Sequence, residues 1–212
     1  MIGIISMNCN EYHIIGMSPG NSYFKDEEIL YLLKTTIDRF GKVAILIADI
    51  PAISTYIALG YPENRARRDK AIPKGNALKN RVRKIMAKLG YSEDIVRIID
   101  WEHEVENNSE YQKSYQNVLE LYKQNRAFHS AADTTTYLVL ESSKKDFDDI
   151  ELATGIAVHY LLSEFAFLEF APSFLEATKV IYVYHKNWQV YEDYIAGKFD
   201  HVVRPNLGFL LL

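Results

Sequence analysis

The sequence contains a single cysteine, Cys9, among its 212 residues, and this scarcity excludes several kinds of site. One thiol cannot form a disulfide within the chain or supply a cysteine cluster for a metal, so we expect Cys9 to be a small buried hydrophobic side chain. The six histidines show no metal-ligand spacing, and no metal site is predicted. The GxGxxG and P-loop patterns are also missing, so the sequence predicts neither a dinucleotide nor an ATP site.

A long uninterrupted apolar run is absent as well. The most apolar stretch, GIAVHYLLSEFAFLEFAPSFL from Gly155, is broken by His159, Glu164 and Glu169 and has Pro172 near its end. This stretch is too polar for a membrane span and predicts a buried helix. No basic residues precede the apolar residues of the N-terminus, so we expect no secretory signal and a cytoplasmic protein.

Charge is plentiful but unevenly distributed. The chain carries 24 basic and 28 acidic side chains, a net charge of −4. Between Glu63 and Arg97, eleven basic residues stand against four acidic ones, so the other residues carry 13 basic and 24 acidic side chains (24 − 11 and 28 − 4), a net of −11. A basic segment in an acidic chain favours a local site for a polyanion, although a solvated helix face would explain the same charges.

Strand-like and helix-like periods alternate along the chain. Apolar runs predict strands over 12–17, 43–50, 96–101 and 179–185. Helical spacing predicts helices over 25–40, 76–89 and 109–128, a long one from about 148, and a last one within 187–199. Residues 129–141 have a mixed pattern. The βαβ order predicts one α/β domain over residues 1–212, with a mostly parallel sheet flanked by helices.

Two polar clusters follow predicted strands that are far apart in the sequence. Ser18, in the stretch GMSPGNSYF, comes after the first strand, and Tyr184 and His185 end the last one. Ligands of such sheets bind beyond the carboxyl ends of the strands, so we expect both clusters at one crevice. Taken alone, the Ser18 stretch is also explained as a turn and helix N-cap, and Tyr184-His185 as strand-end residues bonded to the backbone.

A third cluster lies on the long apolar helix. Tyr160 and Glu164 are four residues apart and therefore share one helix face. A buried carboxylate costs free energy unless it is paired or hydrogen-bonded. Glu164 is therefore either a structural anchor or a working group of a site.

Together these stretches resemble the cyclodipeptide synthases. The resemblance is carried by GMSPGNSYF, by DIPAISTYIALGYPENRARRDKAIPKGNALKNRVRKIM, by the Tyr160/Glu164 pair and by VYH ending at His185. It extends from about residue 13 to about residue 188. It implies a Rossmann-like domain similar to the catalytic domain of class I aminoacyl-tRNA synthetases. It also implies an enzyme that needs no cofactor and joins two aminoacyl groups from aminoacyl-tRNAs into a diketopiperazine.

Carried over by position, the resemblance makes Ser18 the nucleophile of an aminoacyl-enzyme and then a dipeptidyl-enzyme. Tyr160 and Glu164 would hold the aminoacyl group. One subgroup of the family is marked by the residues matching Asn21, Tyr184 and His185, and this chain would belong to it. The first amino-acid pocket is expected to be lined by Ile14, Gly16, Phe167 and Tyr182, and Glu141 is a candidate for the second.

The resemblance also gives the basic segment a partner, because tRNA phosphates would position the acceptor stem without reading its sequence. The expected contacts are Arg65, Arg67, Arg68 and Lys74 in a loop, and Lys79, Arg81, Arg83, Lys84 and Lys88 on the following helix. We expect a monomer with no membrane partner.

Two alternatives remain open from the sequence. One is a serine hydrolase in which His185 is the base for Ser18; the resemblance disfavours it, because the other subgroup has a proline in place of the histidine. The other is a tRNA-binding module without catalysis.

Overall fold

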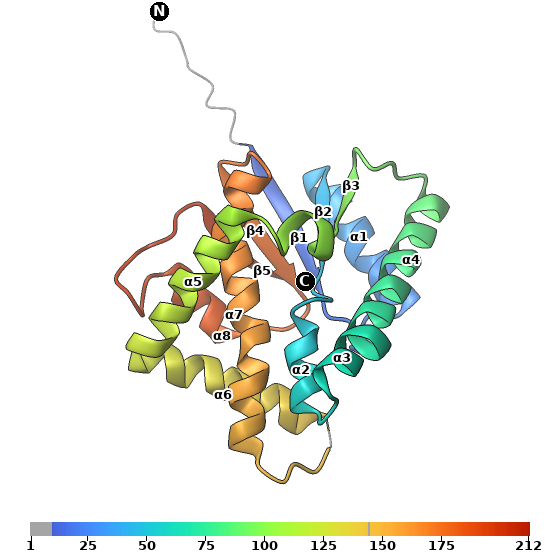
Figure 1. Cartoon of the computed structure of the whole chain (residues 1–212). Helices are drawn as coiled ribbons and strands as arrows, with labels where there is room; N and C mark the ends of the chain where they lie inside the picture. The colour runs from blue at the N-terminus through green and yellow to red at the C-terminus, as the bar shows by residue number, and fades with distance from the viewer. Residues whose placement is uncertain (1–9, 144) are drawn as a thin grey trace, which may run out of the picture.

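The computed structural model of the chain describes residues 10–143 and 145–212, so the expectation for Cys9 lies outside the described residues. At its centre is a five-stranded sheet in the order β3-β2-β1-β4-β5, in which every pair of neighbours is parallel (Figure 1). The strands are β1 (Glu11–Met17), β2 (Val43–Ile47), β3 (Val96–Ile99), β4 (Lys179–Tyr184) and β5 (Leu207–Leu211). The predicted α/β class with a parallel sheet is confirmed.

Helices cover both faces of this sheet. Successive side chains of a strand point to opposite faces, and Ile14 and Ile15 accordingly belong to two different hydrophobic clusters. The cluster of Ile15 contains the apolar sides of α1 (Asp26–Phe40) and α4 (Ile72–Leu89). The cluster of Ile14 contains those of α5 (Ser109–Gln124), α6 (Arg126–Ser142), α7 (Ile150–Phe174) and α8 (Gln189–Ile195). Because both faces are covered, β2 is buried along its whole length and reads as an unbroken apolar run.

The long helix α7 packs on the face of the sheet to which Ile14 points (Figure 1). By length and a mean hydropathy of 1.2 it is the one candidate membrane span among the described residues, and 61% of its most apolar part is buried inside the fold. It packs against α2 (Ala52–Ala58), α5 and α6. Its burial agrees with the prediction of a core helix.

The structure departs from the predicted elements in three places. Residues 109–142 form two helices, because Asn125 is extended (φ −102°, ψ 106°) and its Oδ1 accepts the N–H of Phe128, which caps α6. The strand β5 follows α8, so α8 is not the last element and β4 is not the last strand. The burial pattern of β5 is only partial, since it lies at the sheet edge.

The third departure is the basic segment, in which the predicted loop is helical. Residues between β2 and α4 form α2, α3 (Glu63–Arg65) and the π-helix η1 (Ala66–Ala71), and another π-helix, η2 (Trp101–Val105), follows β3. The helix α4 begins at Ile72, four residues before the predicted start, with Pro73 in its first turn, where proline is well tolerated.

Candidate active site

The two polar clusters predicted to meet are adjacent in the structure. β1 and β4 are neighbours in the sheet, with Ile15 opposite Val183. Ser18 leaves β1 and Tyr184 ends β4 at the same carboxyl edge. The rule that ligands bind beyond the carboxyl ends of parallel strands was therefore sufficient to predict that these residues lie close together.

Ser18 stands in a tight turn that presents its side chain to a cavity. The N–H of Asn21 donates to the carbonyl of Ser18 (3.2 Å), and Gly20 has the positive φ of 82° that glycine adopts without a steric penalty. The Asn21 Oδ1 accepts the N–H of Tyr23 (2.9 Å). The residue before α1 is Lys25, which makes no side-chain cap. The predicted turn is therefore present, but the Ser18 stretch does not supply the N-cap of α1.

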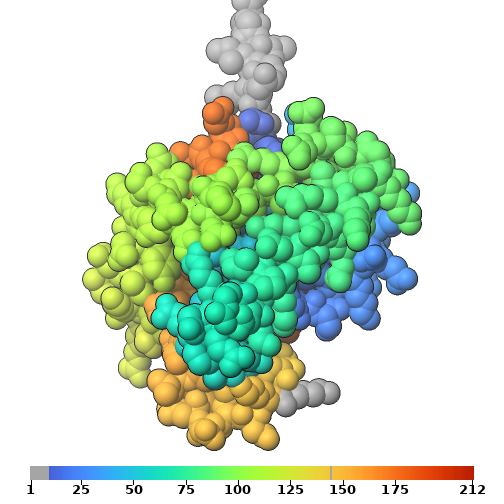
Figure 2. All heavy atoms as spheres, turned by 45° about the vertical axis from the view of Figure 1, so that its right-hand side comes forward, coloured from blue at the N-terminus to red at the C-terminus, as the bar shows by residue number. Residues whose placement is uncertain are grey.

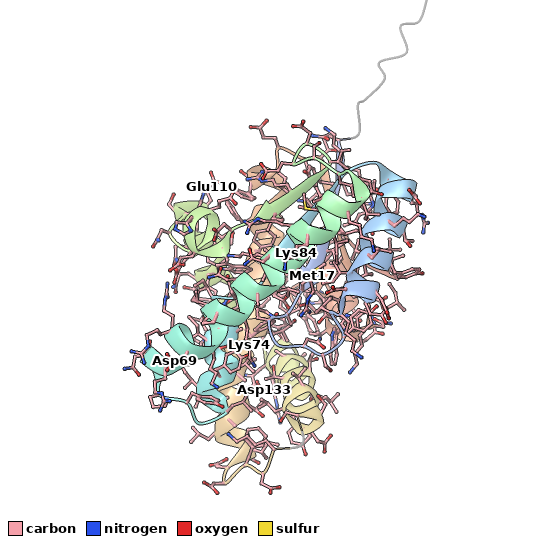
Figure 3. The ribbon with its side chains drawn as sticks, turned by 90° about the vertical axis from the view of Figure 1, so that its right-hand side faces the viewer. Met17, Asp69, Lys74, Lys84, Glu110 and Asp133 are labelled. Carbon is pink, nitrogen blue, oxygen red and sulfur yellow. The ribbon has the colours of Figure 1, made fainter. Side chains whose placement is uncertain are left out.

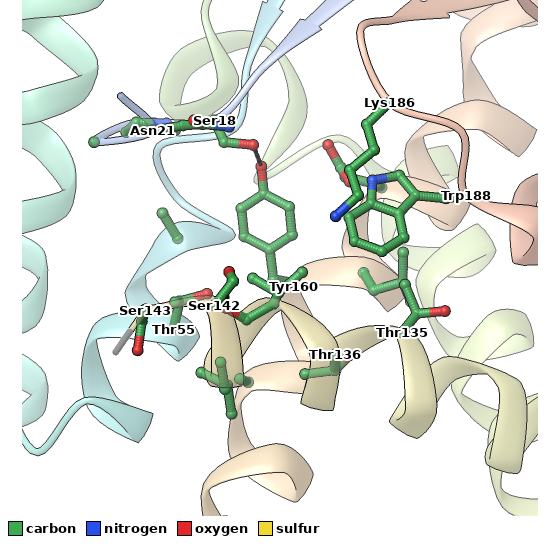
Figure 4. Close-up of a pocket in the computed structure, with 18 of the residues that line it drawn as sticks. Ser18, Asn21, Thr55, Thr135, Thr136, Ser142, Ser143, Tyr160, Lys186 and Trp188 are labelled. Carbon is green, nitrogen blue, oxygen red and sulfur yellow. Dashed lines mark hydrogen bonds between the residues drawn. The ribbon is translucent and has the colours of Figure 1, made fainter. Parts of the chain in front are cut away.

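Two tyrosine hydroxyls contact the Ser18 hydroxyl. The Ser18 Oγ lies 2.8 Å from the Tyr160 hydroxyl of α7 (Figure 4). It lies 3.3 Å from the Tyr184 hydroxyl of β4. Burial raises the pKa of Tyr184 to about 12 and the pKa of Tyr160 well above its ordinary value. Both phenols are therefore protonated near neutral pH and can donate hydrogen bonds to an oxygen that gains negative charge.

Glu164 is held on the same face of α7, one turn after Tyr160. Its side chain is buried, and its two oxygens accept hydrogen bonds from Tyr182 (2.8 Å) and Tyr191 (2.6 Å). Burial raises the pKa of the Glu164 carboxyl, although the tyrosine hydroxyls oppose the rise. Tyr191 was not singled out in the sequence; the signal was its place in the aromatic-rich helix α8.

His185 lies beside the serine turn, where its ring packs against aromatic side chains. Its ring stacks on Tyr23 at 3.7 Å between centroids and meets Phe24 edge-on. Within the described part of the chain, its Nδ1 is buried without a hydrogen-bond partner. Burial, with a smaller contribution from Lys186, lowers the pKa of His185 to about 4. The ring is therefore neutral at physiological pH and packs against the loop that carries Ser18.

These side chains line a cavity of about 530 Å³. Ser18 and Asn21 lie on one side of it and Lys186 and Trp188 on another, with α2, α6 and α7 completing the wall (Figure 4). The contribution of α6 was missed because its sequence was read as a mixed pattern. Lining residues that the sequence did not identify include Thr55, Tyr56, Thr135, Thr136, Val139, Ser142, Ser143, Lys186 and Trp188.

Of the four residues expected in the first amino-acid pocket, only Tyr182 lines this cavity. Gly16 lies behind it: a Cβ on Gly16 would be 1.9 Å from the Tyr182 hydroxyl oxygen. Ile14 and Phe167 are fully buried in the core, where Phe167 packs against Trp101, contrary to the expectation. Spacing placed Phe167 three residues after Glu164, but the helix turns it toward η2. Glu141 is exposed and accepts from the Tyr137 hydroxyl, and its neighbours Leu140 and Ser142 line the cavity instead.

The basic residues of the predicted set lie on α3, η1 and α4, elements that cross one face of the molecule (Figures 2 and 3), and we call this set the basic band. Several are already paired: Arg65 and Arg68 with Asp69, Arg67 with Glu102 and Glu106, and Arg81 with Asp26. Within the described residues, the exposed cations without an acidic partner in the predicted set are Lys74, Arg83, Lys84 and Lys88. Lys74 also lines the cavity, with its Nζ 4.9 Å from the centre of the Tyr56 ring.

Lys79 differs from the rest of the predicted set. Its side chain is only 7% exposed, and its Nζ lies 2.9 Å from Asp49 Oδ2 and 3.3 Å from Asp100 Oδ1. It faces the sheet, so the expectation of a phosphate contact at this residue is wrong. Charge counting along the sequence does not distinguish a buried cation from its exposed neighbours.

Comparison with known proteins agrees with this geometry. The family model described as cyclodipeptide synthase matches residues 6–212. A cyclo(L-leucyl-L-leucyl) synthase of Bacillus subtilis is 25% identical over 98% of this chain and 87% of its own length. Among solved structures, a cyclodipeptide synthase from Staphylococcus haemolyticus superposes with a TM-score of 0.78 at 18% identity, covering 96% of this chain and 90% of that one. A Mycobacterium tuberculosis protein, whose structure demonstrates that cyclodipeptide synthetases are related to type I tRNA-synthetases, superposes with a TM-score of 0.76 at 18% identity, covering 94% of this chain and 84% of that one.

Proposed function

The chain belongs to the cyclodipeptide synthase family, and from this premise we propose that it joins the aminoacyl groups of two aminoacyl-tRNAs through an ester on Ser18. The observation that carries the assignment of the nucleophile is the Ser18 hydroxyl itself. It opens into a cavity and is contacted by two partly buried, protonated tyrosines. One of them, Tyr160, lies one turn of α7 before the buried carboxylate of Glu164. We further propose that residues 1–212 act as one domain and as a monomer.

The first step is transfer of an aminoacyl group to the enzyme. An aminoacyl-tRNA is an activated ester, so its transfer needs no ATP. The Ser18 oxygen attacks the ester carbonyl, the bond to the ribose oxygen breaks, and the proton of Ser18 leaves with the tRNA. The Tyr184 hydroxyl, 3.3 Å from Ser18 Oγ, is placed to donate to the oxyanion that forms.

The later steps form the two peptide bonds. The free amine of a second aminoacyl-tRNA attacks the Ser18 ester, which moves the acyl group onto that amine and frees Ser18. Ser18 then takes over the dipeptide from the tRNA, and the dipeptide's own amine attacks the new ester. This closes the six-membered ring and releases the product. In each step the acyl group moves from one oxygen to another oxygen or to an amine nitrogen, and nothing is oxidised or reduced.

Glu164 is assigned to the amine of the first amino acid. Because burial raises the pKa of this carboxyl, it can bind the ammonium and accept a proton when the amine must become a nucleophile. Tyr160 fixes the same group beside Ser18. Asn21 and His185 hold the loop that carries Ser18. Because the chain has Asn21, Tyr184 and His185, we assign it to the asparagine-tyrosine-histidine subgroup of the family.

The family uses aminoacyl-tRNA substrates, and we assign their phosphates to the basic band. Among the described residues, the exposed cations of the band without an acidic partner need no exchange of one: Lys74, Arg83, Lys84 and Lys88. In contrast, Arg65, Arg68 and Arg81 would exchange an exposed acidic partner for phosphate. Such surface pairs contribute little to stability, so this exchange costs little. Lys74 is the residue of this set that also lines the cavity.

The two alternatives fit the geometry less well. A serine hydrolase needs a base at the serine, and the ring of His185 is stacked on Tyr23 instead. A tRNA-binding module without catalysis would have no use for a serine contacted by two tyrosine hydroxyls beside a buried carboxylate that accepts from two others.

Mass spectrometry of extracts from cells that express the wild-type chain or Ser18→Ala tests the proposal. We expect a cyclic dipeptide only with the wild type, and tRNA binding with both. A folded wild-type protein that binds tRNA and yields no cyclic dipeptide would refute synthesis. Equal product from Ser18→Ala would refute the assigned nucleophile.

A further inference from the structure

Lys79 is a buried cation on a helix whose other cations are exposed. Transferring an ammonium group from water into the protein is costly unless it is paired. Here two carboxylates meet it, at 2.9 Å and 3.3 Å. Burial acts to lower the pKa of Lys79, but the carboxylates outweigh it and the pKa is raised. The charge is therefore retained inside the fold, and its function is not a contact with solvent or with a polyanion.

The two carboxylates stand at the edge of the sheet where the active site lies. Asp49 follows β2 and Asp100 follows β3, and β2 lies between β3 and β1, the strand that leads to Ser18. Asp49 is 1% exposed, and its Oδ1 accepts the N–H of Ile50 at the entry to α2, which lines the cavity. Lys79 thus connects α4 to the ends of two strands and to one wall of the cavity.

Gly75, one turn before Lys79, allows α4 to approach this closely. A Cβ on Gly75 would lie 2.5 Å from the Cβ of Asp49 and 2.8 Å from its Oδ2. Real Cβ atoms essentially never come that close to another atom. The missing side chain and the buried ion pair therefore act on the same contact between α4 and Asp49.

This contact lies between the cavity and the exposed cations of α4. Lys74, five residues before Lys79, lines the cavity, and its Nζ would be 3.1 Å from a Cβ on Gly20, two residues after Ser18. Lys84 (Figure 3) and Lys88 follow Lys79 along α4, and both are exposed. From Lys74 to Lys88 the helix rises by about 21 Å at 1.5 Å per residue. A shift or rotation of α4 would move this whole row of cations relative to Ser18.

We infer that Lys79 is a positioning residue: paired with Asp49 and Asp100, it fixes the register of α4 against the sheet, so that a tRNA bound along α4 delivers its ester to Ser18. The inference rests on the proposed function. Under this inference, Lys79 aligns the bound tRNA substrate and does not contribute to the affinity for it. A misplacement of about 1 Å can lower a catalysed rate by about a hundredfold.

The test compares Lys79→Met with Lys84→Met and with Lys42→Met, a lysine before β2 at the opposite edge of the sheet. Two quantities are measured for each folded variant: the salt dependence of tRNA binding, and the rate of cyclic dipeptide formation at saturating aminoacyl-tRNA. Loss of one phosphate contact makes the slope of log K against log salt shallower by about 1. We expect this for Lys84→Met only. For Lys79→Met we expect an unchanged slope and a rate lower by about tenfold or more, and for Lys42→Met no change in either quantity.

A slope that becomes shallower in Lys79→Met, as in Lys84→Met, would overturn the inference and make Lys79 a phosphate contact. An unchanged slope with an unchanged rate would overturn it as well. If Lys79→Met does not fold, Lys79→Met/Asp49→Asn removes the uncompensated buried carboxylate, and a wild-type rate in this double variant would refute positioning. If the wild type binds tRNA but makes no cyclic dipeptide, the proposed function fails, and the slopes alone still decide whether Lys79 contacts phosphate.

Discussion

Gly16→Ala is predicted to disturb the carboxylate of the active site through Tyr182. The added carbon would lie 1.9 Å from the Tyr182 hydroxyl oxygen and 2.3 Å from its Cζ, where ordinary contact begins at 3.4 Å. The phenol would have to move by about 1.5 Å (3.4 − 1.9). It cannot do so freely, because Tyr182 is 1% exposed and stacks between Tyr184 and Tyr191. We expect its 2.8 Å hydrogen bond to Glu164 to break.

The magnitude combines two effects. Forcing an extra methyl into a packed core costs about 1–3 kcal/mol. Leaving a buried acceptor without its donor costs about 1–3 kcal/mol, so the two effects together should lower the free energy of unfolding of Gly16→Ala by about 2–6 kcal/mol. The same loss of a donor should raise the pKa of the Glu164 carboxyl further, since the tyrosine hydroxyls hold it down.

Urea denaturation of Gly16→Ala, Tyr182→Leu and the double variant measures this coupling. Leucine at position 182 leaves room for the methyl group added at position 16, so the double variant should be no less stable than Tyr182→Leu alone. Strictly additive losses would show that the methyl does not act through Tyr182. A Gly16→Ala protein within about 0.5 kcal/mol of the wild type, the usual range of harmless surface changes, would refute the close approach itself.

Three further predictions concern the neighbours of Ser18 and Glu164. Tyr191→Phe removes the donor to Glu164 Oε2, so the carboxyl pKa rises and the acid limb of the pH–rate profile should move to higher pH. Tyr184→Phe removes one hydrogen bond to Ser18 and should slow formation of the aminoacyl-enzyme up to about tenfold, measured by rapid quench. The pKa of His185 is about 4 in the folded protein, against an ordinary value of 6.5, so between these pH values the unfolded chain binds a proton that the folded chain does not. The free energy of unfolding should therefore fall as the pH drops from 6.5 to about 4. Urea titrations of His185→Asn should show a weaker dependence on pH over this range.

Most of the sheet could be predicted from the sequence, because buried parallel strands are short apolar runs and helices carry a 3.6-residue period. The runs at β1, β2 and β4 were of this kind. β5 was missed because an edge strand lacks a continuous buried pattern. The break between α5 and α6 depends on a single capping residue, Asn125, which a periodicity count does not register.

The candidate site was predictable where topology alone determines position. Ser18 and Tyr184 follow adjacent parallel strands, and Tyr160 and Glu164 share a helix face. Contacts that depend on three-dimensional packing were not predictable. Neither the pairing of Tyr191 with Glu164 nor the burial of Lys79 against Asp49 has a signature in spacing or charge.

The proposed aminoacyl ester on Ser18 can be tested for directly. Wild-type protein is mixed with one aminoacyl-tRNA, quenched in acid within the first turnover, digested, and analysed by peptide mass spectrometry. We predict a mass increase of one aminoacyl residue on the peptide that contains Ser18, and none in Ser18→Ala. Cyclic dipeptide formation with the adduct on another residue, or with no adduct under any quench time, would contradict the assignment of Ser18 as the nucleophile.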